Sequence, residues 1–322
     1  MRLIAAAACF LIAILAGVMF YFPGAEMRRL PSPDAIDIGA SVPLYLEKRE
    51  ARFDDIVEGV EKRVVWAGER GARTDWAVVY LHGFSGSSEE IRPVPDEVAA
   101  ALGANLFYTR FQGHGRSAEA MAAATPGGWG RDVAEAIAVA ERIGDRILVI
   151  SSSTGATLAA IAAADPATVG RIDAHVMISP NFGAQNRASQ LLTWPLAEWW
   201  VPLLAGETRG FEPVNERHAR YWTESYPTVA AIPMQAAVVR ARQLDLSAAE
   251  VPVLLIYSEA DQVVRPDAIR AEMAEWGGPV TRMQISPGDG IDPSNHVLAG
   301  DILSPAATVD VVAEILNWLG GI

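Results

Sequence analysis

Buried strands that alternate with helices are the feature that most restricts how this chain can fold. From about residue 62, short runs rich in Val, Ile and Leu end at Gly, Ser or Asp, and longer stretches with helical periodicity follow them. Runs that are apolar at consecutive positions are typical of strands buried on both faces of a parallel sheet. The pattern therefore predicts an α/β fold with a mostly parallel central sheet and helices on both faces.

The predicted elements follow one another in the order expected of such a sheet. In this class of sheet, sites lie at the carboxyl ends of the strands. Pro93 and Pro95 make the start of the first predicted helix irregular. Strands are expected over 76–81, 105–110, 146–151, 175–179, 251–257 and 281–285, and helices over 87–102, 129–143, 154–164 and 306–319.

The N-terminal 25 residues form a separate apolar segment. Leu3 to Phe22 is a run of 20 residues without a charge, with arginines on either side of it. About 20 apolar residues can span a bilayer as a helix, whereas the apolar core of a signal peptide is roughly 7–15 residues long. We therefore expect residues 1–25 to be a membrane anchor, with a signal peptide as the alternative. The rest of the chain is then expected outside the cytoplasm, in the periplasm if the protein is bacterial.

The remaining chain divides into a core and an insertion. Residues 26–60 form a linker and N-terminal extension, and 61–181 with 251–322 form the α/β core. Residues 182–250 separate two strands by more than a usual crossover, and a long insertion of this kind is often a lid. The alternatives are a cap over a substrate site and a helical subdomain whose aromatic side chains fill its own core. The candidate substrate-binding residues in it are Trp194, Trp199, Trp200 and Trp222.

Composition excludes several classes of function. The chain has 26 basic and 39 acidic residues, a net charge of −13, and no basic stripe. Nucleic-acid binding is therefore not expected, because it needs clustered Lys and Arg. The single cysteine, Cys9, excludes an intramolecular disulfide and a cysteine-based zinc site. The sequence leaves the oligomeric state open.

The strongest indication of chemistry is the pentapeptide 151–155, Ser-Ser-Ser-Thr-Gly, between a predicted strand and a predicted helix. A serine on a tight strand-to-helix turn is raised out of the sheet and lies beside the helix N-terminus. Such a turn needs small residues two before and two after the serine, and Ser151 and Gly155 meet that need around Ser153. The alternative is a polar helix cap. We predict that Ser153 is a nucleophile.

A serine nucleophile needs a base, usually a histidine oriented by an acid. His296 lies in a polar loop between the last predicted strand and helix, from which it can reach back over the sheet. Asp261 follows another predicted strand and is the candidate acid, with Glu259 and Asp267 as weaker candidates. Each of the three predicted residues thus follows a separate strand.

The other four histidines have different expected roles. His82 and His114 are expected to shape loops, and His175, inside a strand, to be a hydrogen-bonded core residue. His218 lies in the insertion and has no partner that the sequence identifies.

An oxyanion hole needs two backbone N–H groups aimed at the developing negative charge. Thr154 directly follows the nucleophile and is expected to supply one N–H, and Phe84 in the glycine-rich loop 82–86 the other. The alternative for this loop is phosphate binding. It lacks the G-x-G-x-x-G and G-x-x-x-x-G-K-[ST] spacings, which argues against that alternative.

Together these residues resemble the α/β-hydrolase family from about residue 62 to 319. His82-Gly83, Ser153, Asp261 and His296 match the family's oxyanion loop, nucleophile, acid and base in chain order. The pattern is most similar to the lysophospholipase and monoacylglycerol-lipase-like carboxylesterases, which include relatives described as serine aminopeptidases.

The resemblance implies hydrolysis of a carboxylic ester, lipid-like or other, through an acyl-enzyme and without a metal or organic cofactor. In one respect the chain departs from the family, because Ser151 replaces the first glycine of the turn. A peptidase on the same fold is one alternative, and a non-catalytic binding module is another. A peptidase that holds a free α-amine needs an acidic group in the insertion. The candidates for that group are Glu198, Glu207, Glu212, Glu216 and Glu224.

Overall fold

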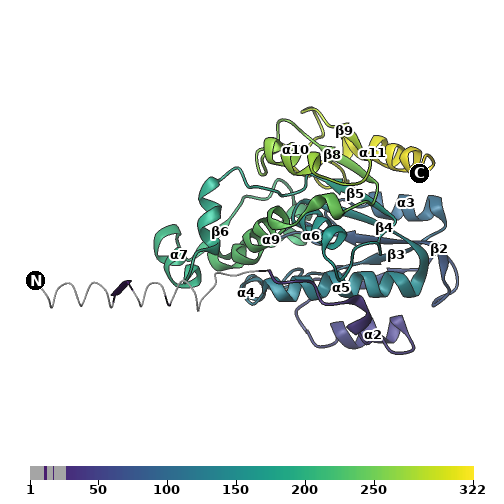
Figure 1. Cartoon of the computed structure of the whole chain (residues 1–322), viewed down its shortest axis with the longest axis horizontal. Coiled ribbons are helices and arrows are strands. Elements are labelled where there is room, and N and C mark those ends of the chain that lie inside the picture. The colour runs from purple at the N-terminus through teal and green to yellow at the C-terminus, as the bar shows by residue number, and fades with distance from the viewer. Residues whose placement is uncertain (1–10, 13–16, 18–26) are drawn as a thin grey trace, which may run out of the picture.

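A seven-stranded sheet forms the centre of the computed structural model, which describes residues 11–12, 17 and 27–322 (Figure 1). Its strands are β1 (Arg63–Val65), β2 (Thr74–Leu81), β3 (Asn105–Tyr108), β4 (Gly144–Ser152), β5 (Ala174–Ile178), β8 (Val253–Tyr257) and β9 (Val280–Gln284). They lie in the order β1-β3-β2-β4-β5-β8-β9, and every neighbouring pair is parallel except β1 and β3. The predicted fold class is confirmed.

Helices cover both faces of this sheet. The α-helices are α2 (Val42–Glu50), α3 (Val94–Leu102), α4 (Ala118–Ala122), α5 (Pro126–Ile143), α6 (Ser153–Ala164), α7 (Ala197–Ala205), α8 (Glu216–Tyr221), α9 (Ile232–Gln243), α10 (Pro266–Ala274) and α11 (Pro305–Leu319). Within β2, Ala77 and Val79 pack in one core layer with α5, α6, α9 and α10, and Val78 and Tyr80 pack in the other with α3 and α11. Burial on both faces explains why the strands are apolar at consecutive positions.

Two details at the N-terminal side of the sheet differ from the expected elements. The helix expected over 87–102 begins at Val94, and residues 88–93 form turns instead. The ring and missing N–H of Pro93 prevent a helix from running through it, whereas Pro95 is tolerated in the first helical turn, where its N–H would have no partner. The short antiparallel edge strand β1 was not predicted, because three residues that include Arg63 form no apolar run.

The insertion between β5 and β8 does not lie wholly apart from the core. It contains α7, α8, α9 and a two-stranded sheet of β6 (Thr208–Gly210) and β7 (Ser225–Pro227), with the 3-10 helices η2 (Arg187–Thr193), η3 (Thr228–Ala231) and η4 (Leu246–Ala248). In Figure 1, α7 lies at the far end of this segment. Helix α9, however, packs on α6 and contributes Ala237 and Ala241 to the core layer.

No helix in the described part of the chain has the length and apolar character of a membrane span. The anchor or signal predicted over residues 1–25 lies outside the described residues, apart from positions 11, 12 and 17.

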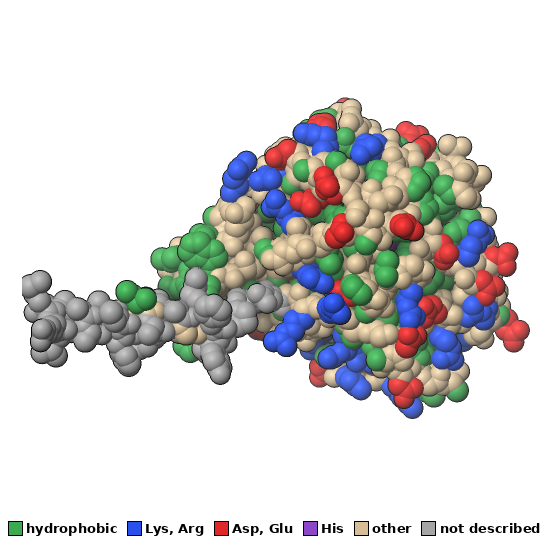
Figure 2. All heavy atoms as spheres, viewed as in Figure 1, with side chains coloured by type: hydrophobic (Ala, Val, Ile, Leu, Met, Phe, Trp, Pro, Cys, Tyr) green, Lys and Arg blue, Asp and Glu red, His purple; other side chains and the backbone are tan. Residues whose placement is uncertain are grey.

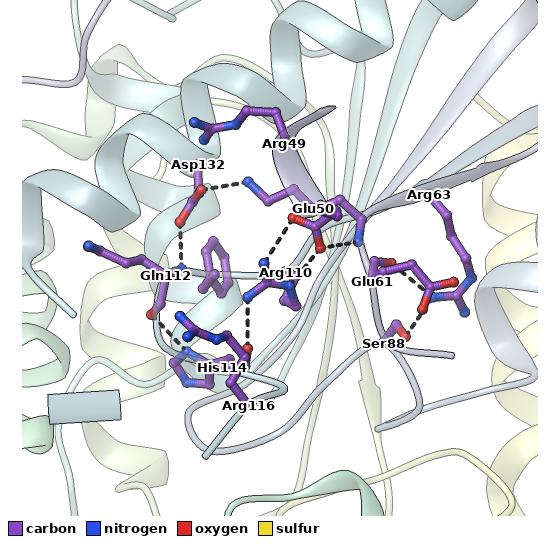
Figure 3. A network of polar contacts seen from close by, with 12 residues as sticks. Arg49, Glu50, Glu61, Arg63, Ser88, Arg110, Gln112, His114, Arg116 and Asp132 are labelled. Atoms are coloured by element: carbon purple, nitrogen blue, oxygen red, sulfur yellow. Dashed lines mark hydrogen bonds and ion pairs between the residues drawn. The ribbon is translucent and has the colours of Figure 1, made fainter. Parts of the chain in front are cut away.

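A buried ion network holds the N-terminal extension against the core. Arg110, in the loop after β3, donates two hydrogen bonds to the carboxylate of Glu50 in α2, at 2.7 and 2.8 Å. It also donates to the carbonyl oxygen of His114 at 3.1 Å (Figure 3). Lys62 is buried beside α5, where its Nζ lies 2.7 Å from Asp132 Oδ1 and also contacts Glu135. The extension thereby fixes the loop that follows β3.

Replacing Lys62 by Met is expected to destabilise the protein by about 3–5 kcal/mol, because it leaves the buried carboxylate of Asp132 without its cation and that of Glu135 with Arg49 alone. Urea unfolding followed by circular dichroism measures the change. Lys48, the only other lysine of the sequence, is exposed in α2 and provides the matched control Lys48→Met. A Lys62→Met change no larger than that of the control would contradict the assigned role of the network.

Candidate active site

The turn from β4 into α6 holds Ser153 in a strained conformation. Its φ is 49°, in the left-handed region that few residues other than glycine adopt. A Cβ at position 155 would lie 2.1 Å from the carbonyl oxygen of Leu81, so the start of α6 packs directly on the end of β2. Ser151 Oγ donates to the carbonyl oxygen of Val176 at 3.0 Å, so a serine is accommodated where the family has glycine.

Three loops at the carboxyl ends of β4, β8 and β9 bring the predicted nucleophile, acid and base into hydrogen-bond contact. His296 Nε2 lies 2.9 Å from Ser153 Oγ, and His296 Nδ1 lies 2.8 Å from Asp261 Oδ2. All three side chains are buried. This geometry allows a proton to pass from the serine hydroxyl to an imidazole whose tautomer is set by the aspartate.

Hydrogen bonds from backbone N–H groups orient both Asp261 and the loop of His296. Asp261 Oδ1 accepts from the N–H groups of Val263 and Val264, each at 2.8 Å. Asp292 Oδ2 accepts from the N–H groups of His296 and Val297 at 3.0 and 2.9 Å. Sequence analysis did not assign Asp292 the role of holding the His296 loop, although Asp292 begins a polar turn of the kind in which aspartate accepts from the backbone.

The surroundings of His296 favour its protonated form. Burial alone lowers the pKa of the imidazole, but the charge and hydrogen bond of Asp261, with the charges of Glu90 and Asp292, outweigh it. The net effect raises the pKa above its usual value of 6.5. The same carboxylates would stabilise the imidazolium that forms when the serine proton is transferred.

Of the residues predicted for the oxyanion hole, Thr154 follows Ser153 in the chain, and Phe84 follows Gly83, where a Cβ would lie 3.2 Å from Ser153 Cβ. Thr154 is in the first turn of α6, where backbone N–H groups have no partner within the helix. No acceptor for the Phe84 N–H is found among the described residues, and Phe84 lines the same cavity as Ser153.

His82 determines the shape of the loop that carries Phe84. Its Nε2 accepts from the N–H of Phe111 at 3.1 Å, so Nδ1 carries the proton and donates to the carbonyl oxygen of Gly83 at 2.8 Å. Burial lowers the pKa of His82 and keeps the ring neutral. The His114 ring packs against the His82 ring at a tilt, with ring centres 5.0 Å apart, and burial lowers the pKa of His114 to about 4. Both act within loops, as predicted.

The remaining histidines differ from expectation in one respect. His175 is a core residue, but neither ring nitrogen has a hydrogen-bond partner among the described residues, and burial lowers its pKa to about 3. The prediction of a hydrogen-bonded histidine there was wrong, since the described residues offer its ring packing against Trp276 and no hydrogen-bond partner. His218 accepts from the N–H of Val214 at 3.2 Å and stacks on Phe211.

A cavity of about 490 Å³ opens beside Ser153 and His296. Volumes of roughly 300–1,000 Å³ are typical of pockets that hold a small molecule. Core and insertion both contribute to its mostly apolar wall. The apolar lining residues are Phe84, Leu192, Phe211, Val214, Trp222, Tyr226, Met234, Val263, Val297 and Leu303.

Of the four tryptophans predicted to bind substrate, Trp222 alone lines this cavity. Trp194 and Trp199 are 59% and 71% exposed at the far end of the insertion, and the Trp200 indole donates to the carbonyl oxygen of Pro195 at 3.0 Å. The structure does not bring these three to the cavity, because α7 packs on η2 and η3. Tyr226, Phe211 and Met234, which sequence analysis did not assign to the site, line the cavity instead.

The insertion provides little acidic surface at the cavity. Of the five glutamates considered for binding an α-amine, Glu212 alone lines the wall, together with the cationic Arg209. The structure does not bring Glu198, Glu207, Glu216 or Glu224 to the cavity.

Glu90 is an acidic group in the cavity wall that sequence analysis did not assign. It is 2% exposed and accepts from the Tyr80 hydroxyl at 2.7 Å and the Gly83 N–H at 2.6 Å. Burial raises the pKa of its carboxyl group, although both donors oppose that effect. The adjacent Glu89 and Glu90 fit the exposed face of the helix expected there, so no sequence signal distinguished Glu90.

Comparisons with known proteins support this fold. A chain described with LipS and LipT, two metagenome-derived lipolytic enzymes, superposes with a TM-score of 0.66 at 20% identity, covering 83% of this chain and 100% of that one. The monoacylglycerol lipase of Paleococcus ferrophilus gives a TM-score of 0.54 at 15% identity over 80% and 98% of the two chains. A soluble variant of the monoglyceride lipase of Saccharomyces cerevisiae gives 0.54 at 11% identity over 81% and 90%. At identities this low, the superpositions establish a shared fold and nothing more specific.

No curated protein matches the sequence. The model of one protein family, described as serine aminopeptidase, S33, matches residues 72–288. That match covers well over half of the chain and includes the candidate nucleophile and acid, and we conclude that this protein belongs to the serine aminopeptidase S33 family of α/β-hydrolases.

Proposed function

We propose that the protein is a serine hydrolase that cleaves carboxylic esters through Ser153, His296 and Asp261. The observation that carries the proposal is the continuous contact from Ser153 Oγ through His296 to Asp261, at 2.9 and 2.8 Å. His296 Nε2 takes the hydroxyl proton while Ser153 Oγ attacks the ester carbonyl carbon. The N–H groups of Phe84 and Thr154 stabilise the resulting oxyanion.

The tetrahedral intermediate collapses when His296 returns the proton to the leaving alkoxide, and an acyl-enzyme on Ser153 remains. A water molecule then adds to the acyl carbon while His296 takes one of its protons. Collapse of the second intermediate returns that proton to Ser153 and releases the acid.

The mostly apolar wall of the cavity supports a lipid-like or other acyl ester as substrate. Neighbours described as lipolytic enzymes and monoacylglycerol lipases are consistent with this choice. Peptidase activity, which the family description suggests, is less well supported, because Glu212 is the insertion's one glutamate at the cavity and shares the wall with Arg209.

Hydrolysis of nitrophenyl esters with short to long acyl chains tests the proposal, since serine-dependent turnover is expected and the preferred chain length reports the depth of the cavity. Aminoacyl nitroanilides measured alongside distinguish the peptidase alternative. Faster cleavage of the amides than of every ester would contradict the ester assignment.

The pH dependence of turnover is expected to follow His296. Because the base must be neutral, and because its pKa lies above the usual 6.5, kcat/KM should fall as the pH drops through a midpoint above 6.5. The kcat/KM of a short nitrophenyl ester measured from pH 5 to 9 checks this. An acid limb centred below 6.5 would show that the carboxylates around His296 do not dominate its ionisation.

Attachment to a membrane, with the α/β core outside the cytoplasm, is the second part of the proposal. Its support is the uncharged run Leu3–Phe22 together with an exposed apolar surface on and near α7. Figure 2 shows green side chains gathered on the left side of the folded body. The apolar side chains most exposed in this region are Trp194, Trp199, Leu203 and Leu204.

Sedimentation with lipid vesicles tests this attachment. The full chain is expected to pellet with the vesicles, and a chain that begins at Arg29 to bind less. Protease accessibility of the full chain in intact cells then tests the side of the membrane. A full chain that stays in the supernatant would contradict membrane attachment.

A further inference from the structure

Glu90 connects three parts of the candidate active site. Its Oε2 accepts from the Gly83 N–H of the oxyanion loop and from the Tyr80 hydroxyl of β2. Its backbone lies against the loop that follows His296, since a Cβ at Gly300 would lie 3.0 Å from the carbonyl oxygen of Glu90. Glu90 therefore contacts the sheet and the loop of Phe84 through its carboxylate, and the loop that follows His296 through its backbone.

The position of this carboxylate depends on the absence of a side chain at residue 83. A Cβ there would lie 2.5 Å from Glu90 Oε1 and 3.2 Å from Ser153 Cβ. The Glu90 carboxylate and Ser153 thus both lie close to the place that a side chain at residue 83 would occupy. No other residue type at position 83 would leave room for the carboxylate to approach the N–H.

The peptide group before Gly83 and the peptide group after it are each held by one hydrogen bond. Glu90 accepts from the N–H of Gly83, and His82 donates to its carbonyl oxygen. A trans peptide is planar, so the N–H of Phe84 points away from the carbonyl oxygen that His82 holds. Glycine adopts many backbone conformations, and without these bonds the Phe84 N–H has no fixed direction.

We propose that Glu90 is a positioning residue, which fixes the Gly83 backbone so that the Phe84 N–H points at the reacting carbonyl oxygen, and whose charge stabilises protonated His296. The inference rests on the proposed function. Three carboxylates from different loops surround His296: Asp261 contacts its Nδ1, Asp292 accepts from its backbone N–H, and Glu90 lines the same cavity. Glu90 is thus a third source of negative charge that the Ser-His-Asp set does not include.

Two substitutions in the full chain separate geometry from charge. Glu90→Leu removes both acceptor oxygens, and we expect kcat to fall about 10- to 100-fold with KM nearly unchanged, because a misdirected oxyanion donor weakens transition-state binding. Glu90→Gln keeps one acceptor for Gly83 but removes the charge. We expect a smaller loss of kcat and a shift of the acid limb of kcat/KM to lower pH.

The matched control is Glu89→Leu. Glu89 pairs with Arg92 at 2.7 Å and does not line the cavity, so its kcat and pH profile are expected to stay close to those of the wild type. Thermal unfolding verifies that each variant is folded. Reaction of Ser153 with a fluorophosphonate provides a readout that needs no natural substrate, and Glu90→Leu should slow it by a similar factor.

Wild-type protein that neither reacts with the fluorophosphonate nor turns over esters would refute the proposed function. A reactive wild type would instead refute the role of Glu90 alone if folded Glu90→Leu kept its kcat, or lost only affinity as measured by KM. Should Glu90→Leu not fold, Glu90→Gln decides, and an unchanged kcat with an unshifted acid limb would refute the proposal.

Discussion

Replacing Ser153 by Ala is expected to lower ester turnover by about 10⁴-fold or more, because no covalent acyl-enzyme can form and the remaining oxyanion hole supplies little of the rate. The fold should be retained, since the substitution removes one oxygen and leaves the packing of Gly155 on β2 intact. Steady-state hydrolysis of a short nitrophenyl ester, with thermal unfolding of the same sample, measures both effects.

The matched control is Ser152→Ala. Ser152 is adjacent and equally buried, and its Oγ has no hydrogen-bond partner among the described residues. Turnover of this variant should stay within a few-fold of wild type. If Ser153→Ala kept its activity while Ser152→Ala lost it, the nucleophile would be the neighbouring serine.

Replacing Asp261 by Asn is expected to lower kcat by about 10⁴-fold. Asp261 Oδ1 accepts from the N–H groups of Val263 and Val264, so the amide oxygen of asparagine will take this position. The amide NH₂ then faces His296 Nδ1, which must accept a hydrogen bond. The proton moves to Nε2, and the ring can no longer receive the proton of Ser153.

The control is Asp267→Asn, at an exposed aspartate that sequence analysis considered as a weaker candidate and that pairs with Arg265 on the surface. Its kcat should match wild type. A comparable loss in both variants, or full activity of Asp261→Asn, would exclude Asp261 as the orienting acid. Proton NMR of the Nδ1–H of His296 reports the tautomer directly.

Much of the fold and of the candidate site could be predicted from local sequence. Consecutive apolar runs predicted parallel strands, because burial on both faces leaves no polar alternation. The serine turn required small residues at 151 and 155, and the structure has contacts at both positions. Asp261 and His296 were identified because parallel strands place the loops after them at one edge of the sheet.

Tertiary packing alone decided which residues surround that edge. Tryptophan content indicated an aromatic insertion, but the path of α7 determined that Trp194 and Trp199 face solvent while Trp222 reaches the cavity. Glu90 and Asp292 are polar residues in loops, indistinguishable in sequence from exposed acids. Each accepts from backbone N–H groups, which every residue except proline carries. Sequence therefore determines the chemistry of the reacting groups, whereas the folded backbone determines what orients them.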